Sequence, residues 1–131
     1  MEEQNPNLKR FRIFKIADGF EVWVGKDSSS NDLLSMKYTL QNDLWFHIHG
    51  YSGSHTVLKA YEEVESIPKD IIKTAASIAA YYSKAKNAGN VLVSYTKAKN
   101  VQKYRGAKSG SVTIKNEKNI KVKPGLPKGM S

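Results

Sequence analysis

The residues best suited to chemistry in this 131-residue chain are its three histidines, which all lie between residues 43 and 55 together with one of two tryptophans. Apolar side chains alternate with rings in the run Leu44-Trp45-Phe46-His47-Ile48-His49, which is the spacing of a β-strand. We expect the apolar residues to enter the core while Trp45, His47 and His49 project from the opposite face. The following Gly50-Tyr51-Ser52-Gly53 is typical of a turn that returns His55 toward the same face.

Two kinds of chemistry are open to these rings. Three imidazoles on adjacent strands, with Asp43 or a glutamate nearby, could hold a metal ion that activates water, which is the alternative of a metal-dependent enzyme. That geometry depends on the turn, and three histidines are a normal number for this length, so we expect no metal, no cofactor and no enzymatic activity. Gly53-Ser54-His55 lacks the nucleophile elbow of serine hydrolases, and the chain has no glycine-rich nucleotide loop.

The distribution of charge favours a polyanion as partner. The formal net charge is +9, but residues 1–83 contain 9 Lys/Arg against 11 Asp/Glu, whereas residues 84–131 contain 12 against the single Glu117. Lysines spread over one surface neutralise phosphates and release counterions, so this excess favours RNA. A solvated basic surface that serves solubility, and an adaptor that holds an acidic protein, remain alternatives. A membrane surface is disfavoured because no basic amphipathic helix is evident.

An RNA site needs cations for phosphates, flat groups for bases, and hydrogen-bonding side chains. We expect Lys97, Lys99, Lys103, Arg105 and Lys108 to form a phosphate track, and Trp45, His47 and His55 to form a stacking and hydrogen-bonding floor beside it. Asp43 could orient an imidazole, or it could cap the turn before its strand; Trp45 could equally cover the sheet. Asn31-Asp32 could cap a helix or belong to the site, and His49 is expected to be an ordinary exposed or boundary histidine.

Composition indicates one domain. The length suits a single core, and there are no cysteines for disulfides or thiolate metal sites. No apolar run approaches the roughly 20 residues of a membrane span, and the first residues lack signal-peptide character, so we expect a cytoplasmic location and no membrane partner. Residues 1–9 and 125–131 are expected to be flexible ends around a domain at 10–124. The oligomeric state stays open.

The remaining pattern predicts an α+β fold with a mainly antiparallel sheet packed against one principal helix. A hairpin is expected at 11–24, turning at Ala17-Asp18-Gly19, and a short helix follows, capped by Ser30 or Asn31. The principal helix begins at Pro68, ends near residues 87–89, and buries a face of Ile72, Ala75, Ala76 and Ala79. Further strands are expected at 55–60, 91–95, 100–104, 111–114 and 119–123.

Six of these segments occur in the order of a known family. They are Gly19-Phe20-Glu21-Val22-Trp23-Val24-Gly25-Lys26, Asn31-Asp32-Leu33-Leu34, Asp43-Leu44-Trp45-Phe46-His47, Gly53-Ser54-His55, Ala75-Ala76 to Ala79-Ala80-Tyr81-Tyr82-Ser83, and Val93-Ser94-Tyr95-Thr96. Together they resemble the NFACT-R domain, the RNA-binding module of the fibronectin-binding-protein-A-like and ribosome quality control NFACT proteins. The likeness extends over about residues 10 to 124.

The resemblance implies a role in ribosome-associated quality control, with tRNA or rRNA as partner and contact with the large ribosomal subunit. The family's N-terminal domain, helix-hairpin-helix segment and coiled coil have no room in this chain, so untemplated tail synthesis by this chain alone is not expected. Residues 105–112 resemble the family's basic Gly-Ala-Lys-Pro-Gly loop, but Ser109 stands where proline is usual. That difference predicts a softer loop that still carries Arg105 and Lys108.

Overall fold

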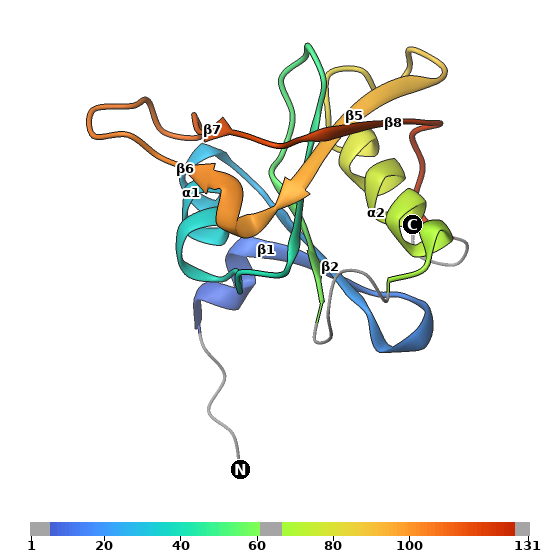
Figure 1. Cartoon of the computed structure of the whole chain (residues 1–131), viewed down its shortest axis with the longest axis horizontal. Coiled ribbons are helices and arrows are strands. Elements are labelled where there is room, and N and C mark those ends of the chain that lie inside the picture. Colours follow the sequence, from blue (N-terminus) through green and yellow to red (C-terminus); the bar gives the residue numbers. More distant parts are fainter. Residues whose placement is uncertain (1–5, 61–66, 128–131) are drawn as a thin grey trace.

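A six-stranded antiparallel sheet forms the frame of the protein in the computed structural model, which describes residues 6–60 and 67–127 (Figure 1). The strand order is β1-β2-β4-β3-β5-β8, and every pair of neighbours is antiparallel. The strands are β1 (Phe11–Lys15), β2 (Glu21–Gly25), β3 (Leu44–Ile48), β4 (Thr56–Lys59), β5 (Val91–Lys97) and β8 (Lys118–Val122). This confirms the predicted α+β class.

The two faces of the sheet are covered differently because side chains alternate along its strands. Helix α2 (Lys69–Tyr81) packs against β3, β4, β5 and β8, over a core that includes Leu44, Phe46 and Ile48. Helix α1 (Ser28–Lys37) contacts β2 and β4, and a smaller core on that side contains Leu34, Trp45 and Val57. The alternation expected for residues 44–48 is therefore confirmed.

A two-stranded sheet of β6 (Val101–Gln102) and β7 (Thr113–Ile114) projects beside α1 (Figure 1). The strands predicted at 100–104 and 111–114 shorten to these pairs, and residues 103–112 form the loop between them. Three short 3₁₀ helices complete the described elements: η1 (Pro6–Arg10), η2 (Ala17–Gly19) and η4 (Ala98–Asn100). The predicted hairpin is confirmed, and Asp18 and Gly19 make its turn with φ of 60° and 80°.

Two predicted helix ends are wrong. Helix α1 is capped by Asp27, whose carboxylate accepts from the Ser30 amide at 2.7 Å while the Ser30 hydroxyl accepts from the Asp27 amide at 2.8 Å. Neither Ser30 nor Asn31 is the cap. Helix α2 ends at Tyr81, and Pro68 is its cap residue. It stops because the Ser83 hydroxyl donates to the Ala80 carbonyl oxygen and the next residues pair with another segment.

The predicted alanine face of α2 is buried, with Ala75, Ala76 and Ala79 inaccessible, although Ile71 is buried more deeply than Ile72. Beyond the predicted domain limit at 124, the Gly125 amide donates to the Ser77 carbonyl oxygen, and Leu126 packs against the core. The rest of the two ends expected to be flexible, residues 1–5 and 128–131, lies outside the described residues. Within the described ranges, neither helix is long and apolar enough to cross a bilayer.

Candidate nucleic-acid interface

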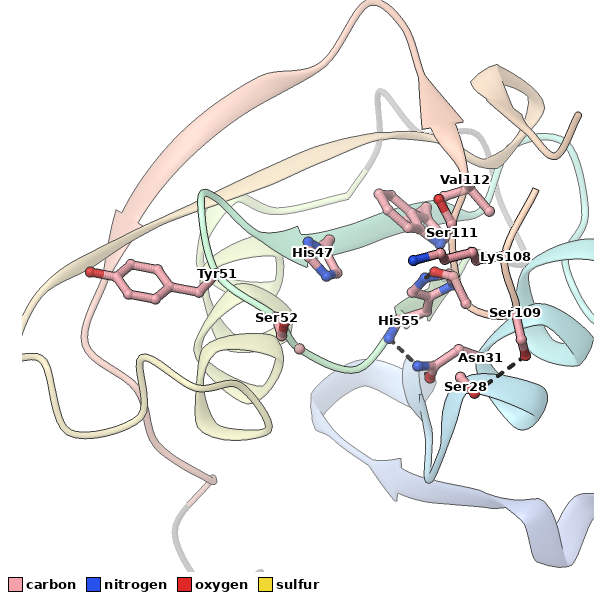
Figure 2. Close-up of a pocket in the computed structure, with 13 residues that line it drawn as sticks. Ser28, Asn31, His47, Tyr51, Ser52, His55, Lys108, Ser109, Ser111 and Val112 are labelled. Carbon is pink, nitrogen blue, oxygen red and sulfur yellow. Dashed lines mark hydrogen bonds between the residues drawn. The ribbon is translucent and has the colours of Figure 1, made fainter.

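An open cavity of about 450 Å³ lies where the end of β3, the turn at 51–53, α1 and the loop at 108–112 meet (Figure 2). We call it the ring cavity. Its lining combines aromatic rings, hydroxyl groups, an amide and one cation: Ser28, Asn31, Trp45, His47, Tyr51, Ser52, Gly53, His55, Lys108, Ser109, Gly110, Ser111 and Val112. The structure thus brings Trp45, His47, His55 and Lys108 together, as predicted for the site.

The three rings differ in how much they offer to a ligand. The Trp45 and His47 rings are stacked, with centroids 5.9 Å apart and planes 10° apart, and His55 stands edge-on to both. Trp45 and His55 are only 3% and 2% exposed, whereas His47 is half-buried. Trp45 therefore mainly covers the sheet, and His47 is the ring that the floor presents.

One hydroxyl group joins the two buried rings. The indole Nε1 of Trp45 donates to Ser35 Oγ at 2.8 Å, and Ser35 Oγ lies 2.7 Å from His55 Nδ1. His55 Nε2 lies 2.9 Å from the carbonyl oxygen of Gly110, which can only accept, so Nε2 carries the proton. In neutral His55, Nδ1 then accepts from the Ser35 hydroxyl.

Burial keeps both cavity histidines neutral. The pKa of His55 is lowered from 6.5 to about 4, mainly by desolvation and to a lesser extent by the charge interaction with the nearby His47. Burial also lowers the pKa of His47. These rings can stack and form hydrogen bonds at neutral pH, but they contribute no positive charge there.

Lys103 fastens the loop at 108–112. Its ammonium group donates to the carbonyl oxygens of Lys108 at 2.6 Å and Ser111 at 2.9 Å, and lies 3.3 Å from Asp32 Oδ2. The same carboxylate oxygen accepts from the Gly110 amide at 2.9 Å. The donors of Lys103 are therefore used within the protein, and its place in a phosphate track stays a prediction.

The Ser109 hydroxyl donates to Ser28 Oγ at 3.2 Å (Figure 2). Gly110 comes so near Ser28 that an added Cβ would lie 3.0 Å from the serine Cβ. Together with the bonds from Lys103, Asp32 and His55, these contacts fix the loop onto α1, where it roofs the ring cavity.

Asp43 is fully buried away from the imidazoles. One of its carboxylate oxygens accepts from Lys59 Nζ at 2.7 Å and from the Leu40 amide, and the other accepts from the Ala60 amide at 2.8 Å. The prediction that Asp43 orients an imidazole is wrong. The other role considered for Asp43 was to cap the turn before β3. The structure shows it, because the Asp43 carboxylate accepts from the Leu40 amide and closes that turn.

The remaining cations of the expected track divide between two places. Lys97 and Lys99 line a separate cavity of about 460 Å³ with Lys115 and Lys118. Arg105 is exposed in the turn that follows Tyr104, whose ring is 62% exposed. Of the five predicted cations, Lys108 alone lines the ring cavity.

The three-histidine metal site does not form. His55 uses both ring nitrogens for protein hydrogen bonds, and His49 Nδ1 lies 3.2 Å from Ser94 Oγ on β5. Across residues 6–60 and 67–127, no group of three or more His, Asp or Glu side chains is placed to hold a metal ion.

Two residues that line the ring cavity, Asn31 and Tyr51, were not assigned to the site from the sequence. Asn31 and Asp32 were left between capping and a site role; neither caps, since Asn31 Oδ1 accepts from the His55 amide at 3.1 Å and Asp32 holds the loop (Figure 2). Tyr51 was assigned only to the turn, yet it lines the cavity and is 53% exposed. An exposed aromatic residue beside the histidine strand was the available signal.

Comparison with known proteins agrees with the sequence resemblance. A family model described as "NFACT protein RNA binding domain" matches residues 10–116. The Rqc2 homolog RqcH of Bacillus subtilis (strain 168) is 35% identical over 123 residues, covering 94% of this chain and 21% of that protein. The Rqc2 homolog RqcH of Streptococcus suis (strain 05ZYH33) is 38% identical over 104 residues, covering 79% and 18%. This chain thus spans about a fifth of the length of both relatives.

A solved structure, the C-terminal part of the fibronectin/fibrinogen-binding protein from Streptococcus suis, is also similar. It superposes with a TM-score of 0.79 at 34% identity, over 95% of this chain and 47% of that one.

Proposed function

Because this chain belongs to the family of NFACT protein RNA-binding domains, we propose that it is a non-enzymatic module that binds RNA through the ring cavity and the cations around it. We infer that it acts in ribosome-associated quality control in the cytoplasm, with tRNA or rRNA as ligand and the large ribosomal subunit as the place of contact. The similarity to two Rqc2 homologs supports this setting.

The observation that carries this proposal is the combination of groups in the ring cavity. His47 offers a half-buried ring, Tyr51 offers an exposed one, and Lys108 supplies a cation at the rim. Stacking on rings holds unpaired bases, and a lysine attracts the backbone phosphates. Arg105 and the pair Lys97 and Lys99 stay candidates for further phosphate contacts, since all three are cations on the same C-terminal segment.

Filter binding of tRNA and of rRNA fragments at two salt concentrations tests the proposal. We expect saturable binding that weakens as salt rises, because phosphate contacts release counterions. Arg105→Glu combined with Lys108→Glu should remove most of the affinity. Lys103 is left unchanged, since its loss would disturb the loop itself.

The matched control is Lys37→Glu combined with Lys73→Glu, two exposed lysines on α1 and α2 that line neither the ring cavity nor the Lys97 cavity. It changes the net charge equally and should leave most of the affinity. Absence of saturable binding at low salt would refute the proposal. Displacement of an acidic protein ligand by RNA separates this function from the adaptor alternative, for which RNA should not compete.

A further inference from the structure

A second cavity of about 370 Å³ adjoins the ring cavity. It is lined by Arg12, Lys26, Ser52, Gly53, Ser54, Tyr81, Tyr82, Ser83 and Lys84. Ser52 and Gly53 line both cavities, so the two are neighbours at the turn at 51–53. The cations of this second part come from β1, from the end of β2 and from the segment after α2.

The turn between the two cavities lies directly against the end of α2. Gly53 forms a bridge with Ser83, the Ser54 amide donates to the Tyr82 carbonyl oxygen at 3.0 Å, and the Lys84 amide donates to the Ser52 carbonyl oxygen at 2.8 Å. A Cβ on Gly53 would lie 2.9 Å from the Ser83 Cβ. A side chain at position 53 would therefore push the two segments apart.

Three cations line this second cavity, and none of them has an acidic partner among residues 6–60 and 67–127. In the described part of the chain, no carboxylate forms an ion pair with Arg12, Lys26 or Lys84, and neither cavity is lined by Asp or Glu. The Arg12 guanidinium lies 4.8 Å from the centre of the Tyr82 ring, and Lys26 Nζ donates once, to the Lys9 carbonyl oxygen at 2.9 Å. Like charges gathered in a concave site raise the local potential for an anion.

A purely structural explanation accounts for part of this cluster. Lys84 follows the C-terminus of α2, where a cation interacts favourably with the helix dipole. Arg12 is stabilised by a cation–π interaction with the Tyr82 ring. Neither effect requires Lys26, from the end of β2, to line the same cavity. These local effects leave unexplained why three cations line a cavity that has no carboxylate in its lining and lies next to the ring cavity.

We propose that this second cavity is a phosphate-binding part of the interface, in which Arg12, Lys26 and Lys84 hold the backbone of an RNA strand that has a base at His47 and Tyr51. The strand crosses the turn at Gly53 between the two parts. This inference rests on the proposed RNA-binding function and adds three cations to it, all outside the predicted basic track.

Lys26→Glu combined with Lys84→Glu tests the assignment, with fluorescence anisotropy of a labelled oligouridine of about ten nucleotides as readout. We expect an affinity loss of at least about tenfold. The slope of log K against log salt should become shallower by about 1.4, since each single-strand phosphate contact contributes about 0.7. The Lys37→Glu, Lys73→Glu protein changes the net charge equally and should lose less than about threefold, with its slope unchanged. Thermal melting checks that both proteins fold, and the two glutamine double variants replace any that does not.

The outcomes separate this inference from the function on which it rests. Equal losses in the two double variants would overturn the second cavity as a contact. If they are equal while Arg105→Glu with Lys108→Glu still weakens binding, RNA binding stands and this assignment falls. If wild-type protein does not bind the oligouridine, tRNA or rRNA at low salt, both fall.

Discussion

Buried His55 should make the folded protein less stable as the pH falls below 7. Its pKa is about 4 in the folded protein and about 6.5 in an unfolded chain. Between these values the unfolded chain binds a proton that the folded protein does not, so the stabilisation is complete above pH 6.5 and is lost as pH falls toward 4. The cause is structural, since a charged imidazole would be desolvated beside Trp45 and His47.

The size of the effect follows from the two pKa values. At about 1.4 kcal/mol per pH unit, the whole interval corresponds to about 3 kcal/mol, of which about 2 kcal/mol falls between pH 7 and pH 5. Urea unfolding at these two pH values measures the loss directly. His47, whose pKa is also lowered, adds to it in the same direction.

His55→Gln should remove the His55 part of this pH dependence, whatever it does to stability at pH 7. His49→Gln is the matched control, because His49 is exposed and should leave the dependence in place. An NMR titration of the His55 ring with a midpoint near 6.5 would refute the reasoning. So would an unchanged loss of stability in the His55→Gln protein.

Two further predictions concern Asp43 and Lys103, whose side chains bind other groups of the protein. Asp43→Ala should lower the free energy of unfolding by about 3–5 kcal/mol in urea, because it leaves the buried Lys59 ammonium unpaired; Asp43→Ala with Lys59→Met should recover part of that loss, and no recovery would contradict the pairing. Lys103→Met should speed amide hydrogen exchange at Gly110 while β5 stays protected. The control Lys115→Met changes an exposed lysine and should leave exchange at Gly110 as it is. Unchanged Gly110 exchange in the Lys103→Met protein would show that Lys103 does not fasten the loop.

The alternation of apolar residues was enough to predict which way a side chain points where the sheet determines its environment. The alternation at residues 44–48 correctly predicted the faces of β3, because one face must pack on α2. The cap of α1 was harder, since residues 27–31 are Asp-Ser-Ser-Ser-Asn and each can cap. Only hydrogen bonds of the folded chain distinguish Asp27 from its neighbours.

Charge counts were a weaker guide to the site. They could not show that Lys103 pairs with Asp32, because a composition profile contains no information on partners distant in sequence. They also passed over Arg12 and Lys26, which lie in the acidic part of the chain and reach the second cavity only through strand pairing. A residue's partners follow from topology, which one sequence shows only in outline.

The loop at 103–112, which covers the rings, affects how the protein folds during synthesis. Gly110 meets Asp32 and Ser109 meets Ser28 across separations of 78 and 81 residues, so these contacts close the longest loops of the site. During synthesis from the N-terminus, β1 to β4 and both helices exist before this loop is translated. In a nascent chain, Trp45 and His55 would therefore stay open to solvent until residues 103–112 emerge. We expect the ring cavity to form only after that point.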